Sequence, residues 1–167
     1  MDNFRWVDGH ADIWRIFADG GAFTDVVAGL AEPWTDAGVT HVVGIEARGF
    51  IVGAPVAVAL KAGFVAARKG PAGTLPGPVL RTTTAPDYRA VRHDLRVQEV
   101  LGPGARVLLV DDWAERGSQA EAAAALVRRA GAELLGVSLV VDELPAAVRT
   151  RLSRVTALVG RHELSGI

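Results

Sequence analysis

The chain has 167 residues, which suits a single domain, and half of its residues are hydrophobic, so a sizeable core is possible. The net charge of −1 argues against a general nucleic-acid or membrane binder, and the lack of cysteine excludes disulfides and thiolate metal sites. The N-terminus shows no apolar signal-peptide core, and no apolar run reaches the roughly 20 residues that span a bilayer, so we expect a soluble, cytoplasmic protein.

Helical and strand patterns alternate along the chain. Apolar residues recur at helical spacing in some segments, whereas others are short, continuous apolar runs typical of buried strands. In chain order we predict a helix at 22–37, a strand at 41–45, a helix at 50–62, a strand at 64–67, a strand at 106–110, a helix at 118–130, a strand at 134–141 and a fifth candidate strand at 155–159.

This alternation predicts right-handed βαβ units around a parallel sheet. The strands are uniformly apolar, which indicates that helices cover both faces of the sheet. We therefore predict an α/β fold, a doubly wound and mostly parallel sheet of about five parallel strands, in one domain spanning 1–167. The stretch 69–104 is rich in Gly, Pro, Thr and Arg, and its length predicts a functional segment such as a flexible lid.

The segment VLLVDDWAERGSQ, residues 107–119, carries the strongest functional signal. Asp111 and Asp112 follow an apolar strand, and a short loop then opens a helix near Ser118. Ligands of open parallel sheets bind beyond the carboxyl ends of the strands, and N–H groups at a helix start favour an anion such as phosphate. Carboxylates suit sugar hydroxyls and a hydrated Mg²⁺. A sugar phosphate would suit both the acidic pair and the helix start. Solvated acids beside a helix start would give a similar pattern.

Together with a second segment, this motif resembles the type I phosphoribosyltransferases, which use 5-phosphoribosyl-1-pyrophosphate (PRPP). Residues 107–119 resemble their PRPP-binding signature, and GIEARGFIVGAPVAVAL at 44–60 closely resembles adenine phosphoribosyltransferases. Shorter matches are VAARKG, the Leu-Pro-Gly turn at 75–77, Asp87-Tyr88, Glu-Leu-Pro at 143–145 and DIWRIFADGGAF at 12–23. The resemblance covers nearly the whole chain and implies this fold, with a small N-terminal hood at about 1–22 and a flexible lid at about 69–104.

The resemblance also implies roles for individual residues. It places the pyrophosphate of PRPP on Ala47, Arg48, Gly49, Arg68 and Lys69, with a non-proline cis peptide at Glu46–Ala47. Asp111 and Asp112 would hold the ribose and, indirectly, Mg²⁺, which is the expected cofactor. Asp87 and Tyr88 would take part in proton transfer and lid closure, or would form only a polar turn. Thr74 stands where the family has a lysine, so one cationic contact is missing.

The phosphate loop departs from the adenine enzymes, whose acidic pair leads to a small residue and then Thr-Gly-Gly-Thr. Here the predicted 5′-phosphate site is Arg116, Gly117, Ser118 and Gln119, preceded by Glu115. The Arg116 side chain either replaces the lost hydroxyl donors or points to solvent. Relatives that act on 6-oxopurines place an Asp at the position of Glu115, facing the base, so Glu115 is a candidate for catalysis and base binding.

The hood differs as well. His10 and Ala11 stand where adenine enzymes carry Phe-Arg. Trp113 replaces an aliphatic residue that lies under the base in relatives, and its ring either stacks on a flat heterocycle or only packs. The candidate base-binding residues are Ile13, Trp113 and Glu115.

These features predict PRPP-dependent phosphoribosyl transfer to a purine or purine-like base, giving a nucleoside 5′-monophosphate and pyrophosphate. The expected partners are PRPP and a heterocyclic nucleobase, in a homodimer that binds neither nucleic acid nor membrane. Two alternatives stay open. The altered phosphate loop favours a non-catalytic regulator that binds PRPP or nucleotides, since fold does not fix function. The altered hood and Trp113 favour a phosphoribosyltransferase for a modified base in a specialised pathway.

Overall fold

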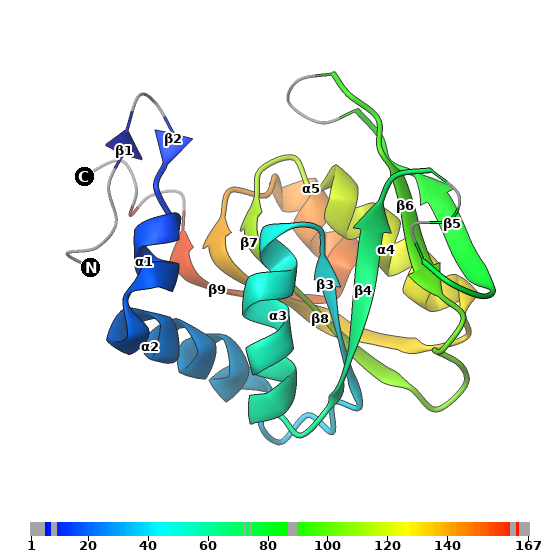
Figure 1. Cartoon of the computed structure of the whole chain (residues 1–167), viewed down its shortest axis with the longest axis horizontal. Helices are drawn as coiled ribbons and strands as arrows, with labels where there is room; N and C mark the ends of the chain where they lie inside the picture. Colours follow the sequence, from blue (N-terminus) through cyan, green and yellow to red (C-terminus); the bar gives the residue numbers. More distant parts are fainter. Residues whose placement is uncertain are drawn as a thin grey trace.

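The chain folds around one seven-stranded sheet (Figure 1). The computed structural model describes residues 6–7, 10–71, 73, 75–86, 90–160 and 163. The strand order is β5-β6-β4-β3-β7-β8-β9, in which the run from β4 to β9 is parallel and β5 and β6 are antiparallel at one edge. The predicted doubly wound, mostly parallel α/β fold is confirmed.

The five parallel strands match the five predicted apolar runs. The strand at 41–45 has the predicted bounds, and the other four are longer than predicted. The five strands are β3 (His41–Ile45), β4 (Gly63–Lys69), β7 (Arg106–Ala114), β8 (Glu133–Asp142) and β9 (Arg154–Gly160). The two antiparallel edge strands are β5 (Val79–Thr83) and β6 (Asp94–Gln98). A separate short pair, β1 (Trp6–Val7) and β2 (His10–Ala11), lies near the N-terminus.

The helices lie on both faces of the sheet. They are α1 (Trp14–Ala18), α2 (Gly20–Ala31), α3 (Arg48–Ala59), α4 (Ser118–Arg129) and α5 (Ala146–Arg149), with 3₁₀ turns η1 (Glu32–Trp34) and η2 (Thr150–Leu152). Asp19 caps α2, because its Oδ1 accepts a 2.8 Å hydrogen bond from the Ala22 N–H. This helix ends before residue 37, the end expected from the sequence, since the chain tightens into η1 at Pro33.

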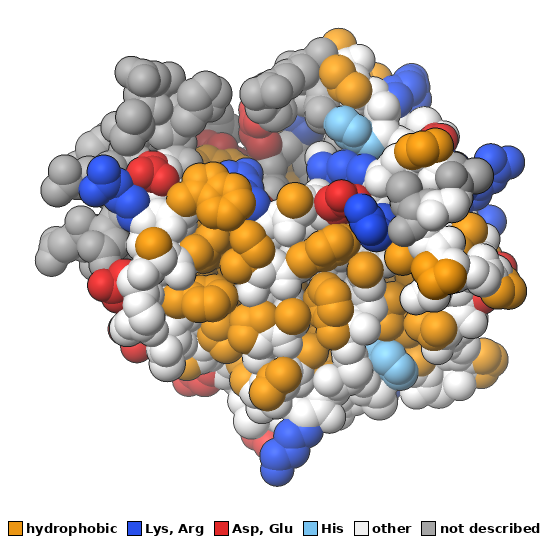
Figure 2. All heavy atoms as spheres, viewed as in Figure 1, with side chains coloured by type: hydrophobic (Ala, Val, Ile, Leu, Met, Phe, Trp, Pro, Cys, Tyr) orange, Lys and Arg blue, Asp and Glu red, His pale blue; other side chains and the backbone are white. Residues whose placement is uncertain are grey.

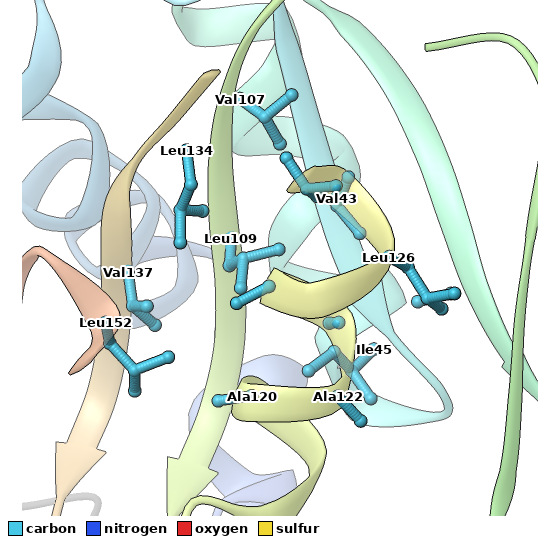
Figure 3. Close-up of a cluster of buried hydrophobic side chains, with 14 of the residues drawn as sticks. Val43, Ile45, Val107, Leu109, Ala120, Ala122, Leu126, Leu134, Val137 and Leu152 are labelled. Atoms are coloured by element: carbon cyan, nitrogen blue, oxygen red, sulfur yellow. The ribbon is translucent and has the colours of Figure 1, made fainter. Parts of the chain in front are cut away.

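The side chains at 107–110 of β7 alternate between two cores, as the pleat of a strand requires. Val107 and Leu109 enter the α4-side core, which lies between the sheet and α4 (Figure 3). Leu108 and Val110 enter the α3-side core, to which α2 and α3 contribute Leu30, Val52 and Val56. Because both faces are buried, the strands read as continuous apolar runs, and this explains why the sequence revealed them.

The stretch 69–104, in which the sequence indicated no strand, contains the paired strands β5 and β6, and its role as a lid stays a prediction. Leu95 and Val97 of β6 are buried in the α4-side core, so this hairpin belongs to the sheet. The N-terminal segment, with β1, β2 and α1, stands at the side of the molecule where β9 forms the sheet edge (Figure 1). Its role as a hood stays a prediction. Within the described ranges, no helix combines the length and apolar character needed to cross a bilayer.

Candidate active site

The candidate site lies where β7 runs on past its neighbour β3. The pairing of β3 with β7 ends at Gly44 and Val110, whereas β7 continues to Ala114 with only β8 beside it. Asp111 and Asp112 therefore lie within a longer strand than the sequence predicted. Next to them the chain leaves β3 and starts α3, so the acidic pair and the helix start share one edge of the sheet.

The start of α3 approaches the acidic pair very closely. A Cβ atom on Gly49 would lie 2.7 Å from Oδ1 of Asp111 and 3.1 Å from the Val110 carbonyl oxygen, so only glycine fits this contact. The Glu46–Ala47 peptide is cis, as the resemblance implied. Nε of Arg48 lies 2.9 Å from Oδ2 of Asp112. The structure thus brings together Arg48, Gly49 and both acids.

Burial shapes the charge of the acidic pair. The Asp112 side chain is only 5% exposed, and its Oδ2 accepts no well-directed hydrogen bond, because the contact with Arg48 has ion-pair distance but poor N–H geometry. Burial raises the pKa of Asp112, while the Arg48 charge opposes that rise. Burial, together with the charge of Asp112, raises the pKa of Asp111 well above its ordinary value. The pair is therefore costly to ionise without a cation or donor nearby.

The end of β4 adds two more predicted cations, Arg68 and Lys69. The Glu46 carboxylate accepts hydrogen bonds from Nη2 of Arg68 at 3.3 Å and from the Lys69 N–H at 2.7 Å. Partial burial works against ionisation of Glu46, but these hydrogen bonds and the nearby positive charges outweigh it and lower its pKa. The Lys69 charge also acts on Asp111. The predicted pyrophosphate residues therefore cluster around the β3–α3 turn, where Arg48 and Arg68 each face a carboxylate.

The predicted phosphate loop lies at the start of α4, on the opposite face of the sheet from α3. Gly117 has φ +74°, and a Cβ there would lie within 2.7 Å of both Leu144 and Val148 side chains, so glycine is required. Ser118 is buried, whereas Glu115 and Arg116 are exposed. The first N–H groups of a helix lack intrahelical acceptors, so this helix start favours an anion. The roles of Arg116, Ser118 and Gln119 stay predictions.

Two of the three predicted base contacts, Ile13 and Trp113, belong to the same core. Trp113 packs against the α3-side core, and that core contains Ile13, whose side chain is fully buried. Nε1 of Trp113 donates a 2.9 Å hydrogen bond to Oε2 of Glu143. Ile13 offers no accessible surface in this conformation, so its contact with a base stays a prediction. Asp87, Tyr88 and Thr74 lie outside the described residues, as do the side chains of His10 and Ala11.

Sequence reasoning did not predict the contacts that Glu46 makes with Arg68 and Lys69, or that Glu143 makes with Trp113. Both follow the ends of apolar strands, the same position that drew attention to Asp111. Applying the strand-end rule to β3 and β8 as well as β7 would have found them.

Comparison with known proteins agrees with this geometry. No protein-family model matches the sequence. The adenine phosphoribosyltransferase of Streptomyces avermitilis is 43% identical over 131 residues, which cover 78% of this chain and 70% of that protein. The solved adenine phosphoribosyltransferase of Rhodothermus marinus is 31% identical with a TM-score of 0.82 and covers 95% and 94% of the two chains. That of Giardia lamblia, complexed with 9-deazaadenine, is 33% identical with a TM-score of 0.81 and covers 92% and 87%.

The parallel sheet, with an acidic pair beside the arginine-bearing start of α3, is the architecture of a type I phosphoribosyltransferase. At the level of identity found with the bacterial relatives, the chain belongs to the adenine phosphoribosyltransferase family. It is therefore a phosphoribosyltransferase, and these relatives do not favour the alternative of a non-catalytic regulator.

Proposed function

We propose that this protein transfers the phosphoribosyl group of PRPP to a purine base and releases a nucleoside 5′-monophosphate and pyrophosphate. The observation that carries the proposal is the position of Asp111 and Asp112 between two helix starts, those of α3 and α4. PRPP has a pyrophosphate at one end of the ribose and a phosphate at the other. An acidic pair flanked by two anion-favouring helix starts matches that charge pattern.

The α3 start is suited to the pyrophosphate end. Arg48 offers a planar fork of donors and would exchange Asp112 for pyrophosphate oxygens. Lys69 adds a positive charge, which already acts to lower the pKa of Asp111 in the free protein. In the reaction the C1′–O bond to pyrophosphate breaks with its electron pair leaving on oxygen, and a ring nitrogen of the base donates its pair to C1′. The proton that the purine carried on its ring N–H is released to water or to the departing pyrophosphate. Cations at the pyrophosphate would stabilise the charge that develops on it.

The acidic pair is suited to the ribose and to Mg²⁺. Carboxylate oxygens accept hydrogen bonds from ribose hydroxyls, and Oδ2 of Asp112 still lacks a well-directed donor. Within the described residues no group of three or more His, Asp or Glu side chains gathers around one point, so the protein alone would hold a metal weakly. Mg²⁺ fits as an ion that arrives with PRPP oxygens and waters, close to Asp111 and Asp112, and it would neutralise the leaving pyrophosphate.

Adenine is the first base to test, because the relatives carry that name and one of them was solved with 9-deazaadenine. A thermal-shift screen of adenine, hypoxanthine and guanine with Mg²⁺–PRPP tests the proposal, since a ligand that binds only the folded state raises the Tm. A rise with Mg²⁺–PRPP that grows with one purine supports it. No rise with any combination would contradict PRPP binding.

A second candidate is a purine other than adenine, favoured by Glu115 and Trp113. Glu115 directly follows the last residue of β7, and it is exposed, whereas Ser118 at the start of α4 is buried. A carboxylate there suits a base that carries an N–H donor. Exposure also leaves Glu115 able to turn away from a bound 5′-phosphate and toward the base.

Substitutions of the loop residues Glu115 and Arg116 are expected to affect different steps. Arg116→Ala should weaken PRPP binding about ten- to a hundredfold, because a charge-assisted hydrogen bond is worth roughly 1.5–3 kcal/mol. Glu115→Gln should reduce turnover or base binding more than PRPP binding. Calorimetry with PRPP and steady-state rates measure the two. If Arg116→Ala binds PRPP normally while Glu115→Gln binds it more tightly, then Glu115 only repels the phosphate and Arg116 does not compensate.

We also propose that the protein works as a homodimer in which a second copy covers α3. After Arg48, every residue of α3 is apolar or glycine, and a helix that is apolar on all sides is normally buried on all sides. Val58 is nevertheless 78% exposed, and Phe64 on β4, whose ring packs against Phe50 of α3, is 37% exposed. Figure 2 shows hydrophobic side chains gathered on this face.

The dimer makes a direct prediction for Val58. Val58→Glu should shift the protein toward monomer in light scattering after size exclusion, because a buried carboxylate would have to leave water. Val100→Glu is the matched control, since Val100 is also exposed but lies after β6, away from α3. A wild-type protein that is monomeric at micromolar concentration would sink this proposal.

A further inference from the structure

The segment that follows β8 is bonded to the end of β7 at two points. The Glu143 N–H donates to the Ala114 carbonyl at 2.9 Å, and the Glu143 carboxylate accepts from Nε1 of Trp113, also at 2.9 Å. Trp113 and Val141 are paired in register on the two strands. One residue thus fixes both the backbone beside Trp113 and the indole ring itself.

The hydrogen bond matters because the χ2 torsion of a tryptophan is broad. The Trp113 side chain packs against the α3-side core, and apolar contacts of this kind are not directional. The indole has a single donor, so its bond to Glu143 selects one ring orientation. Trp113 is only partly buried, which leaves part of its ring accessible.

The segment that carries Glu143 is itself held rigidly. Oδ1 of Asp142 accepts from the Leu144 N–H at 2.8 Å, and Oδ2 of Asp142 forms an ion pair with Arg149. Leu144 and Val148 also pack where a Cβ on Gly117 would have to go, so the segment supports the start of α4. A side chain on such a segment can hold its partner with little freedom.

We propose that Glu143 is a positioning residue that holds the Trp113 indole as a flat platform on which the purine stacks. This inference rests on the proposed transfer to a purine. It assigns to Glu143 an effect on the base alone: the carboxylate acts through the ring and touches neither PRPP nor the reacting atoms.

Steady-state rates with adenine, or with whichever of hypoxanthine and guanine the wild type uses, test the proposal. Glu143→Ala should raise the KM for the base about tenfold, the usual effect of losing a hydrogen bond to a charged group, with the KM for PRPP unchanged. Glu143→Gln should restore the base KM, because the amide oxygen still accepts from the indole N–H. The matched control is Glu133→Ala. Glu133 pairs with Arg106 at 2.8 Å at the opposite ends of the same two strands.

A double-mutant cycle with Trp113→Phe shows whether Glu143 acts through the indole. The Glu143→Ala effect on the base KM should vanish in the Trp113→Phe background. An unchanged base KM in Glu143→Ala, or the same rise in both backgrounds, would overturn the proposal.

Trp113 fluorescence separates this inference from the proposed function. The Trp113 signal is taken as the difference between each protein and its Trp113→Phe counterpart, without any ligand. Acrylamide quenching of that signal should increase in Glu143→Ala and stay normal in Glu143→Gln. If the wild type transfers to no base, the proposed function fails. If Glu143→Ala leaves acrylamide quenching of Trp113 unchanged, the positioning role of Glu143 fails, whatever the transfer assay shows.

Discussion

Replacing Asp111 and Asp112 together by Asn is expected to lower turnover at least about a thousandfold. In the proposed reaction each substitution removes a negative charge that would face the ribose and Mg²⁺, and such single losses typically cost about 10²–10³ in kcat. The fold should persist, because Asn has nearly the same shape as Asp and both positions lie in a strand anchored by β8. The rate of pyrophosphate release measures turnover, and circular dichroism shows whether the double variant is folded. Rates like those of the wild type, in a folded double variant, would exclude these residues from the chemistry.

The single variant Asp111→Asn adds a test of stability, because the burial of Asp111 determines whether the variant is more or less stable than the wild type as the pH rises. The folded-state pKa of Asp111 is raised, so the folded carboxyl holds its proton more tightly than the unfolded one. The stability that this contributes is present below the unfolded pKa, about 3.9, and is lost as the pH rises through the folded pKa. Asn does not titrate, so the Tm of Asp111→Asn should exceed that of the wild type increasingly from pH 5 to pH 8, by about 2–4 °C per kcal/mol. A constant Tm difference would contradict the raised pKa.

Arg48→Ala is expected to lower kcat/KM for PRPP about 10²–10³-fold, because Arg48 would otherwise stabilise the departing pyrophosphate. Arg48→Lys should recover only part of the loss, since an ammonium lacks the planar fork of donors. The free protein should also become less stable, because Asp112 is buried and would lose its ion-pair partner. The half-exposed position of Arg48 moderates that cost.

The matched control for Arg48 is Arg106→Ala, which breaks an arginine–carboxylate pair at the far end of β7 and β8. It should change stability slightly and leave PRPP kinetics unchanged. Calorimetry with PRPP and steady-state rates distinguish the two variants. Normal PRPP binding by Arg48→Ala would show that the β3–α3 turn does not hold the pyrophosphate.

The parallel core could be predicted from the sequence because both of its faces are buried. The run at 107–110 has no polar residue, and its side chains enter two different cores. The hairpin of β5 and β6 could not be predicted in the same way. Its apolar residues Leu95 and Val97 alternate with charged and polar ones, which is typical of a half-buried strand, but the pattern covers only five positions inside a stretch rich in Gly, Pro, Thr and Arg. Its place in the sheet depends on pairing with β4, which is distant in sequence.

The site was predicted as separate motifs, and the structure supplies their relations. Arg48 and Asp112 were assigned to different parts of PRPP, but in the free protein they form an ion pair across 64 positions of sequence. That contact depends on how the start of α3 faces the end of β7, which no local pattern encodes. The partner of the Trp113 indole was also beyond prediction, because Glu143 reaches it only after β8 pairs with β7.

Base-dependent release of pyrophosphate is the most direct test of phosphoribosyl transfer at this site. The wild-type protein is incubated with Mg²⁺ and PRPP, with adenine, hypoxanthine or guanine or with no base, beside the Asp111→Asn, Asp112→Asn double variant. We expect one purine to give pyrophosphate and an equal amount of its nucleoside 5′-monophosphate, and the double variant to give neither. Release that is the same with and without every base, by a protein that binds PRPP in calorimetry, would contradict transfer and identify a PRPP-binding protein without this activity.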